Sequence, residues 1–302
     1  MKKQYFDSLE KWFMGQDREP VCICMICGEE ANCSNYLKDY DYCRTVTCET
    51  CGFMWEWWQP TQEVLDDFYT DSGPVKKWAK IKSTAEEDHR QSKKFDYFNV
   101  LASKGAAVLD VGCGNGHFLN GLDSSIIKIG IEQSKESAAH CKFAVYSDYD
   151  KLKESLHGER KYSLITFFGV LEHLKDPIAE LKKYEELLEE GGVIGIIVPN
   201  LDSLVVRTLG KECCTFCPQH LWYYDINTLT KLMGKLNYHL LSYGTREAEL
   251  QPVLRDLKGL APYDYMFNLT DKDITEEKIL DHGLGYKITA LYQKGGMNEC
   301  NL

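Results

Sequence analysis

Two groups of residues in this chain have the types and spacing of sites that do chemistry. The first is a pair of CxxC turns near the N-terminus, Cys24/Cys27 and Cys48/Cys51, with twenty residues between them. Each CxxC turn directs two thiolates toward one point, and two such turns supply the ligands of a tetrahedral Zn²⁺. A glycine follows each pair and lets backbone amides turn toward the sulfurs. We therefore expect a zinc ribbon here.

The surroundings of the CxxC turns indicate what the ribbon does. Acidic residues outnumber basic ones between residues 21 and 60, which disfavours contact with a phosphate backbone. The tryptophans at 55, 57 and 58 are expected to form an apolar interface with the rest of the chain. A structural zinc is the favoured interpretation. Three further cysteines of this region are expected to be thiols rather than ligands: Cys22, Cys33 and Cys43.

The second group is a glycine-rich turn that follows a short apolar run, residues 106–111, in which Asp110 is the acid. Its glycines form a GxGxG pattern: Gly112, Gly114 and Gly116. Such glycines let the backbone approach a nucleotide closely, and an acid about twenty residues further on, here Glu132, accepts from ribose hydroxyls. Dinucleotide enzymes share this logic. The turn alone predicts a nucleotide site and leaves the ligand open, although the third glycine of the dinucleotide pattern is missing.

The elements that must position these residues alternate between strand and helix. Strands are expected at 106–111, 126–131, 143–146, 163–168, 193–198, 239–245 and 286–293. Helices are expected after the glycine turn, at 134–142, at 178–190 with Gly191-Gly192 as its stop, and after an N-cap at Asn227. This alternation predicts an α/β fold with a mostly parallel sheet covered by helices on both faces.

At this point the chain resembles a known family. Residues 108–118 resemble motif I of class I S-adenosylmethionine (SAM)-dependent methyltransferases, 167–177 resemble their fourth-strand "VLEHLxDP" segment, and 191–200 resemble their "GGxxxxxxPN" segment. The resemblance implies a seven-stranded, mostly parallel Rossmann-like sheet with an antiparallel last strand, and SAM as the cofactor. The residues it implies for cofactor binding are Asp110, Gly112, Gly114, Gly116, Phe118, Glu132, Asp148 and Phe168, with Glu132 on the ribose and Asp148 near the adenine.

The resemblance is strongest to the small-molecule branch that includes ubiquinone-type O-methyltransferases. A CxxCG…CxxCGF module also occurs on sugar methyltransferases of this kind, which implies a hydroxyl of a sugar or nucleotide sugar as the acceptor. The chain ends before the further domain that deoxysugar C-methyltransferases carry, which favours O-methylation. Some ubiquinone-type enzymes hold a metal with an acid at the position of Gly169, so no active-site metal is expected. A zinc-ribbon RNA methyltransferase and a catalytically idle SAM-binding module are the alternatives.

Transfer of a methyl group to a hydroxyl gains from a general base, and histidine is the usual one near neutral pH. His173 follows the fourth strand, and His220 lies in an aromatic and polar run after the fifth. We favour His220 as the base, with a rate that rises with pH near the usual histidine pKa unless burial shifts it. A second metal site from Cys214, Cys217 and His220 is a further hypothesis, although reduced thiols are favoured.

Composition bounds the remaining alternatives. The 302 residues carry a net charge of −11, which disfavours nucleic acid and anionic membranes as partners. No run of 18 apolar residues and no secretory signal is visible, so a cytoplasmic protein with reduced thiols is expected. The expected domains are a ribbon segment (1–60), a helical connector (61–105) and a methyltransferase domain (106–302) with a helical insert at 247–283. The basic stretch of the connector is either a solvated helix or a lid over an anionic substrate. Oligomeric state is not predicted.

Overall fold

The computed structural model describes residues 2–31, 36–40, 43–84, 98, 105–256 and 274–295. Its helices are α1 (Lys2–Phe13), α2 (Gln62–Asp71), α3 (Gly73–Lys82), α6 (His117–Gly121), α7 (Lys135–Ala138), α8 (Tyr149–Lys153), α9 (Pro177–Glu185), α10 (Leu204–Leu209), α11 (Ile226–Gly234), α12 (Leu250–Asp256) and α14 (Glu276–Asp281), with short 3-10 helices η1 (Leu171–His173) and η2 (Gly210–Glu212). Its strands are β1 (Arg18–Pro20), β2 (Tyr36–Tyr40), β3 (Cys43–Thr47), β4 (Met54–Glu56), β5 (Trp58–Pro60), β6 (Ala107–Val111), β7 (Ile127–Ile131), β8 (Ala144–Tyr146), β9 (Tyr162–Phe168), β10 (Leu188–Pro199), β11 (Trp222–Tyr223), β12 (Tyr238–Arg246) and β13 (Lys287–Lys294).

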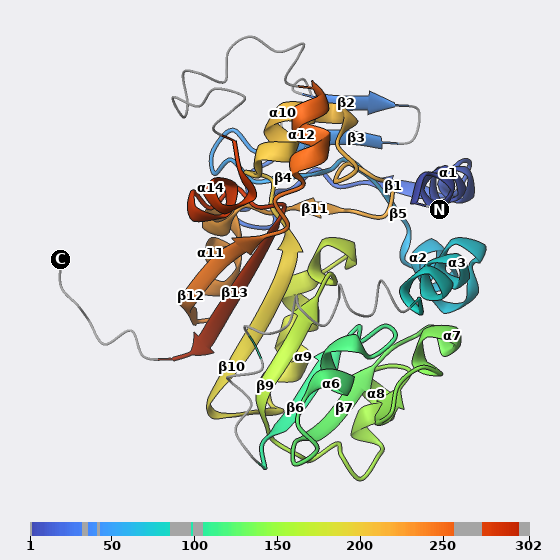
Figure 1. Ribbon diagram of the computed structural model, residues 1–302, viewed down its shortest axis with the longest axis vertical. Coiled ribbons are helices and arrows are strands. Elements are labelled where there is room, and N and C mark those ends of the chain that lie inside the picture. Colours follow the sequence, from blue (N-terminus) through green and yellow to red (C-terminus); the bar gives the residue numbers. More distant parts are fainter. Residues whose placement is uncertain are drawn as a thin grey trace, which may run out of the picture.

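A seven-stranded sheet forms the centre of the molecule, with strand order β12-β13-β10-β9-β6-β7-β8 (Figure 1). Strands β10, β9, β6, β7 and β8 pair in parallel, whereas β13 is antiparallel to both of its neighbours. The predicted Rossmann-like sheet and its antiparallel last strand are therefore confirmed.

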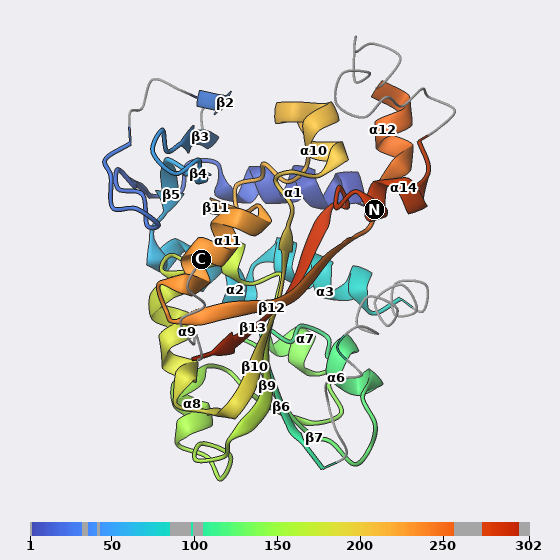
Figure 2. The same cartoon turned by 90° about the vertical axis from the view of Figure 1, so that its left-hand side faces the viewer.

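Helices cover both faces of this sheet, with α8, α9 and α11 on one face and α6 and α7 on the other (Figure 2). Neighbouring residues of β6 illustrate the alternation, because Leu109 and Val108 belong to different cores. The first core joins the sheet to α8, α9 and α11 through Leu152, Leu181 and Leu229. The second joins it to α6 through Phe118 and Leu119. Burial on both faces explains why the central strands are apolar throughout.

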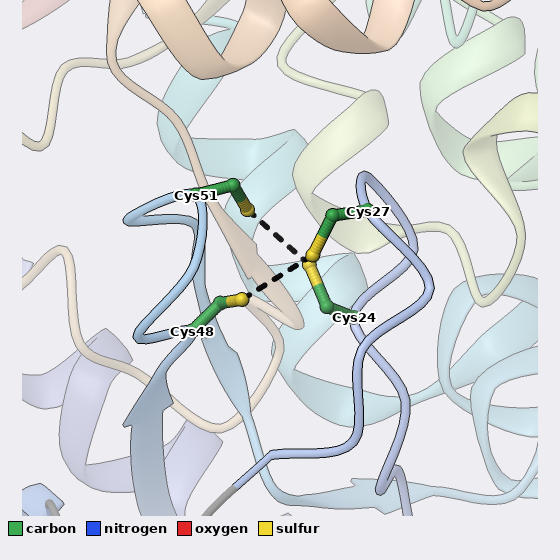
Figure 3. A group of neighbouring side chains, drawn as sticks. All are labelled: Cys24, Cys27, Cys48 and Cys51. Carbon is green, nitrogen blue, oxygen red and sulfur yellow. Dashed lines mark hydrogen bonds between the residues drawn. The ribbon is translucent and has the colours of Figure 1, made fainter.

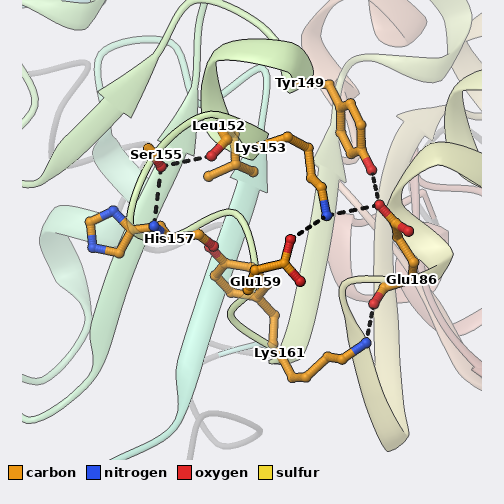
Figure 4. A network of polar contacts seen from close by, with 9 residues as sticks. Tyr149, Leu152, Lys153, Ser155, His157, Glu159, Lys161 and Glu186 are labelled. Atoms are coloured by element: carbon orange, nitrogen blue, oxygen red, sulfur yellow. Dashed lines mark hydrogen bonds and ion pairs between the residues drawn. The ribbon is translucent and has the colours of Figure 1, made fainter.

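At the amino end of β9, an exposed polar network ties the ends of α8 and α9 together (Figure 4). The Lys153 Nζ lies 3.0 Å from a carboxylate oxygen of Glu186 and 3.3 Å from one of Glu159. Tyr149 donates to the Glu186 carboxylate, and Lys161 donates to the Glu186 carbonyl. These groups lie at the amino edge, so they take no part in a site at the carboxyl edge.

The N-terminal part packs against the sheet domain and shares a strand with it. Within the described residues, a small sheet consists of β2, β3 and β4 and of a fourth strand, β11, that comes much later in the sequence. Trp222 pairs with Trp55 in this sheet. Trp55 is fully buried and Trp57 is partly buried against the same core, whereas Trp58 is 39% exposed, so Trp55 and Trp57 form the predicted interface.

The connector forms two helices that meet at Ser72. Ser72 ends α2 and also caps α3, because its hydroxyl accepts from the Val75 N–H. The side-chain amide of Asn115 donates to the Ala79 carbonyl at 2.9 Å and anchors α3 to the glycine-rich turn. Helices α2 and α3 thus lie over the carboxyl edge of the sheet (Figures 1 and 2). Of the basic stretch, which runs from Lys76 to Lys94, the first part lies in α3 and residues 85–94 lie outside the described residues.

Three expected element boundaries are wrong. Helix α9 ends at Glu185, and Gly191 lies within β10 at a bulge, with φ +73°, rather than at a helix end. Helix α11 is capped by Asp225, whose carboxylate accepts from the Thr228 N–H, and Asn227 lies inside the helix. Helix α7 is also shorter than expected, although Ser134 caps it.

The insert between the last two strands is partly described. It contains α12 and α14, as expected, and residues 257–273 lie outside the described residues. In the part of the chain that the structure describes, no helix has the length and apolar character needed to cross a membrane.

Candidate active site and zinc site

The glycine-rich turn joins β6 to α6 at the carboxyl edge of the sheet. The N–H groups of Gly112 and Cys113 donate to the Ile131 carbonyl at 2.8 and 3.0 Å, which fixes the turn to the end of β7. All three glycines have positive φ: Gly112 +72°, Gly114 +54° and Gly116 +74°. A Cβ at Gly112 would lie 2.5 Å from Val170, whereas none of the surrounding atoms lies within 4 Å of a Cβ at Gly114. This open backbone fits the close approach of a nucleotide cofactor.

Glu132 lies against this turn. One carboxylate oxygen accepts from the Gly114 N–H at 2.8 Å and the other from the Ser134 N–H at 2.8 Å. Burial raises the pKa of Glu132, and these two amides oppose the rise. Both carboxylate oxygens are therefore held at the turn, and contact of Glu132 with a ribose remains a prediction.

Asp110 is a buried carboxyl at the end of β6. The Thr166 hydroxyl donates to it at 2.6 Å. Burial raises its pKa to about 7, the negative charge of Glu132 adds to the rise, and Thr166 opposes it. Asp110 thus lies behind the turn, in the sheet.

The other three residues expected at the cofactor have local structural roles as well. Asp148 is exposed and caps α8, accepting from the Lys151 N–H at 2.8 Å and the Ser147 hydroxyl at 2.7 Å. Phe118 and Phe168 pack together with ring centroids 5.0 Å apart, and Phe98 packs on Phe168 at 4.4 Å. Their contacts with a cofactor remain predictions.

The two candidate bases come together although 46 residues separate them along the chain. His173 lies in η1 and His220 in the loop before β11, and their ring centroids are 4.8 Å apart. The Nδ1 of His173 lies 2.9 Å from the Gln219 carbonyl, and the Nδ1 of His220 lies 2.7 Å from the Thr215 carbonyl. A carbonyl only accepts, so each Nδ1 carries a proton, and in a neutral ring the Nε2 then holds the lone pair.

Burial and the charge of His173 lower the pKa of His220 well below its usual value. The imidazole is therefore neutral at physiological pH. If His220 is the base, burial moves the expected rise of rate to a pH below the usual histidine pKa.

Glu172 completes this group. Its carboxyl is 3% exposed, and one oxygen lies 3.9 Å from the His173 Nε2. The other oxygen has no hydrogen-bond partner within the described residues. Burial raises the pKa of Glu172, and the charge of His173 opposes the rise. Glu172, His173 and His220 place one ligand atom each within 4.8 Å of one another, an arrangement that can share a proton or hold a cation.

Tyr69 of α2 adds a phenol that the sequence did not single out. Its ring lies edge-on to His173, with centroids 5.8 Å apart, and its hydroxyl is buried without a hydrogen-bond partner within the described residues. Burial raises the pKa of Tyr69 most, and the charges of Glu172 and Glu132 both contribute. The negative charges of Glu132 and Glu172 therefore both act on the Tyr69 hydroxyl, and its ring contacts His173. Its position in a connector helix gave no sequence signal.

The four cysteines of the CxxC turns converge (Figure 3). Their sulfurs all lie within 4.8 Å of one another, with Cys24–Cys51 at 3.5 Å and Cys27–Cys48 at 3.4 Å. A tetrahedral zinc with bonds of about 2.3 Å needs sulfurs about 3.8 Å apart, so this donor set fits Zn²⁺. Gly28 and Gly52 donate to the carbonyls of Cys24 and Cys48, with φ of +81° and +76°. The two glycines therefore close the turns that carry the cysteine pairs.

The hypothesis of a second metal site made by Cys214, Cys217 and His220 finds no such convergence. The Cys214 sulfur lies 3.4 Å from the Tyr286 hydroxyl. Among the described residues, His220 gathers with Glu172 and His173 rather than with two thiols.

With this geometry established, comparison with known proteins identifies the family. A family model described as "Methyltransferase domain" matches residues 86–243, more than half of the 302-residue chain. The chain belongs to this family. Its sheet order and glycine turn make it a class I SAM-dependent methyltransferase.

Individual relatives agree. The ubiquinone biosynthesis O-methyltransferases of two Xanthomonas campestris pv. campestris strains, B100 and 8004, are each 27% identical over 180 residues, which cover 53% of this chain and 68% of theirs. Among solved structures, the complex between the Haloferax volcanii Trm112 methyltransferase activator and a methyltransferase gives a TM-score of 0.51 at 16% identity, over 77% of this chain and 98% of that one. The magnesium protoporphyrin IX methyltransferase of Synechocystis PCC 6803 gives 0.51 at 12% identity, over 78% of this methyltransferase and 100% of that one. These two structures show the shared fold.

Proposed function

We propose that this methyltransferase transfers the methyl group of SAM to a hydroxyl of a small molecule, with a sugar or nucleotide sugar as the favoured acceptor. The observation that carries the proposal is the neutral His220 beside Glu172 and His173. A hydroxyl is a weak nucleophile that needs a base, whereas this group would be idle with an acceptor that is already a good nucleophile. The ubiquinone O-methyltransferase relatives support an oxygen acceptor.

The chain's residues divide the work between two ends of the site. Glu132 and the 112–116 turn hold the cofactor, which when bound supplies an electrophilic methyl group on a sulfonium. At the other end, the Nε2 of His220 accepts the proton of the acceptor hydroxyl, and the Nδ1–H bond to Thr215 keeps the imidazole in that tautomer. Glu172 offers negative charge near the imidazolium that forms. Tyr69 offers a hydroxyl that hydrogen-bonds a polar acceptor.

Two other functions are less well supported. RNA methylation by a zinc-ribbon enzyme requires a basic surface, and the net charge of −11 opposes it. Burial of a carboxyl and two imidazoles costs stability. An idle SAM-binding module would gain nothing from such groups at the acceptor end.

We also propose that the four cysteines hold one structural Zn²⁺. The convergence of the sulfurs and the glycine knuckles support it. Elemental analysis of the purified chain should find about one zinc per chain, and Cys48→Ser should lose it.

A methyl-transfer assay tests the function. Purified enzyme with isotopically labelled SAM is offered nucleotide sugars, hydroxylated aromatic compounds and transfer RNA, and the labelled product is identified by mass spectrometry. The proposal expects label on a hydroxyl oxygen of a small molecule. Label on RNA or on a nitrogen would contradict it. Added Mg²⁺ or Mn²⁺ should leave the rate unchanged, because proton transfer goes directly to His220.

The matched control uses two histidines of different surroundings. His220→Gln removes the base, whereas His157→Gln changes a histidine that hydrogen-bonds Tyr146 on the other side of the sheet domain. Only His220→Gln should lower turnover. Equal turnover of both variants would contradict the assigned base.

A further inference from the structure

The segment that carries the candidate base is attached to the sheet domain on one side. We call residues 219–224 the acceptor segment, because they contain His220 and its neighbours along the chain. Three hydrogen bonds join it to η1 and the following residue: Leu221 N–H to the Glu172 carbonyl at 2.7 Å, His173 Nδ1–H to the Gln219 carbonyl at 2.9 Å, and Trp222 Nε1–H to the Leu174 carbonyl at 2.6 Å. The position of His220 is therefore tied to that of Glu172 and His173.

The zinc ribbon holds the same segment from the other side. The Leu221 carbonyl accepts from the Glu56 N–H at 2.9 Å and from the Gln59 side-chain amide at 3.3 Å. The next residue, Trp222, pairs with Trp55 of β4. The strand that leaves His220 is thus an outer strand of the ribbon sheet.

Phe53 connects this strand to the zinc knuckle. Its N–H donates to the Cys51 sulfur, and its carbonyl accepts from the Cys48 N–H at 2.8 Å. Its fully buried ring stacks on Trp222, with centroids 6.0 Å apart and planes 16° apart. Two zinc-binding cysteines and the acceptor segment therefore meet at one aromatic residue.

The cofactor end is held by other elements. The bonds that fix the 112–116 turn and Glu132 come from the end of β7, from Ser134 and from α3. A disturbance of the ribbon should therefore reach the acceptor end first.

We propose that the zinc ribbon is a positioning element of the active site, in which Phe53 holds the acceptor segment and thereby orients His220. The inference rests on the proposed function only for the task that His220 performs. In this proposal the zinc takes no part in the reaction but helps to hold the catalytic histidine in place. Phe53 is a positioning residue, because it touches Trp222 and Tyr224 rather than the acceptor.

The test measures the protection of His220 without any acceptor. Diethyl pyrocarbonate acylates unprotonated imidazole nitrogens, and peptide mass spectrometry gives the rate at each histidine. The full-length, zinc-loaded protein is compared with Phe53→Leu. The matched control is Tyr184→Leu, another side chain of the same core with 1% exposure, which lies on α9 away from the ribbon. Exposed His140 serves as the internal reference.

In Phe53→Leu, acylation of His220 should rise at least about tenfold relative to His140, because the segment opens locally. Tyr184→Leu should leave the His220 rate unchanged. The affinity for S-adenosylhomocysteine (SAH), measured by calorimetry, should stay within about twofold in both variants, because the cofactor end has its own supports. Zinc content should also stay that of the parent protein.

Three results would overturn the inference: an unchanged His220 rate in Phe53→Leu, an equal rise in Tyr184→Leu, or a loss of SAH affinity in parallel with the rise. Removal of zinc by a chelator is a second way to disturb the ribbon. It should likewise raise the acylation of His220 and leave the SAH affinity within about twofold. Since none of these readouts involves methyl transfer, a failure of the proposed function in the acceptor assay stays distinguishable from a failure of this inference.

Discussion

At the scale of single residues, we propose that Glu132 decides cofactor binding. Its carboxylate accepts from the Gly114 N–H of the glycine-rich turn. Glu132→Ala removes the acceptor of two ribose hydroxyls and leaves them unpaired, which costs about 1.5–3 kcal/mol, or roughly tenfold to a hundredfold in affinity. Calorimetry with SAH measures the loss. Exposed Glu154→Ala is the control, and equal affinity of the two variants would contradict the assignment.

We propose that His220 decides turnover through contact with the acceptor rather than the cofactor. A general base contributes about 10²- to 10⁴-fold, so His220→Ala should lower kcat by that order while the SAM affinity is unchanged. Burial holds the pKa of His220 well below its usual value, so the wild-type rate should show no histidine titration from His220 between about pH 6.5 and 8. A kinetic pH profile measures this. A variant with normal kcat would transfer the role to His173.

The sequence predicted Glu132 and the glycines as site residues, but not Glu172 and Tyr69. Glu132 and the glycines follow from spacing along one strand–turn–helix unit, so local pattern was sufficient. Glu172 lies in the "VLEHLxDP" segment without a predicted role, and Tyr69 lies in no motif, because their significance comes from how they lie around His173 in the folded chain. Periodicity does not report such contacts.

At the scale of elements, the cap of α11 gives a direct comparison. Asp225 accepts from the Thr228 N–H at 2.8 Å in a capping box, whereas Asn227, the residue expected to cap, is exposed inside the helix. Asp225→Ala should lower the free energy of unfolding by about 1 kcal/mol, and Asn227→Ala should change it by less than about 0.5 kcal/mol. Urea denaturation of the two variants measures this. The opposite order would restore Asn227 as the cap.

The central strands were predictable because each is a short apolar run that ends in a polar or glycine-containing turn. The errors fell where two signals compete. Gly191-Gly192 matched a helix stop, but the pairing of β10 with β9 and β13 takes these residues into a long strand with a bulge. The pairing of β11 with β4 was also unpredicted, since a two-residue strand has no periodicity.

At the scale of the whole molecule, the ribbon and the sheet domain form one folding unit. Phe53 covers Trp222 and Tyr224, and β4 pairs with β11, so a chain that starts at residue 61 would expose this aromatic surface. We expect that truncated chain to be insoluble, unlike the full-length chain. Sedimentation and calorimetry compare the two. A soluble truncated chain with native SAH affinity would show that the sheet domain folds independently.

The buried carboxyl of Asp110 makes the stability of the whole protein depend on pH. Its pKa in the folded protein is raised to about 7, chiefly by burial, whereas an unfolded aspartate titrates near about 3.9. Between these values the folded state binds the extra proton, so its stability falls as the pH rises toward and through 7. Asp110→Asn removes this term. Between about pH 5.5 and 8, wild type should therefore lose about 2 kcal/mol of unfolding free energy relative to Asp110→Asn. Urea denaturation of both proteins at the two pH values measures the difference, in which the titrations of His220 and the other groups cancel. Parallel pH dependence of the two proteins would mean that Asp110 is ionised in the folded state throughout this range.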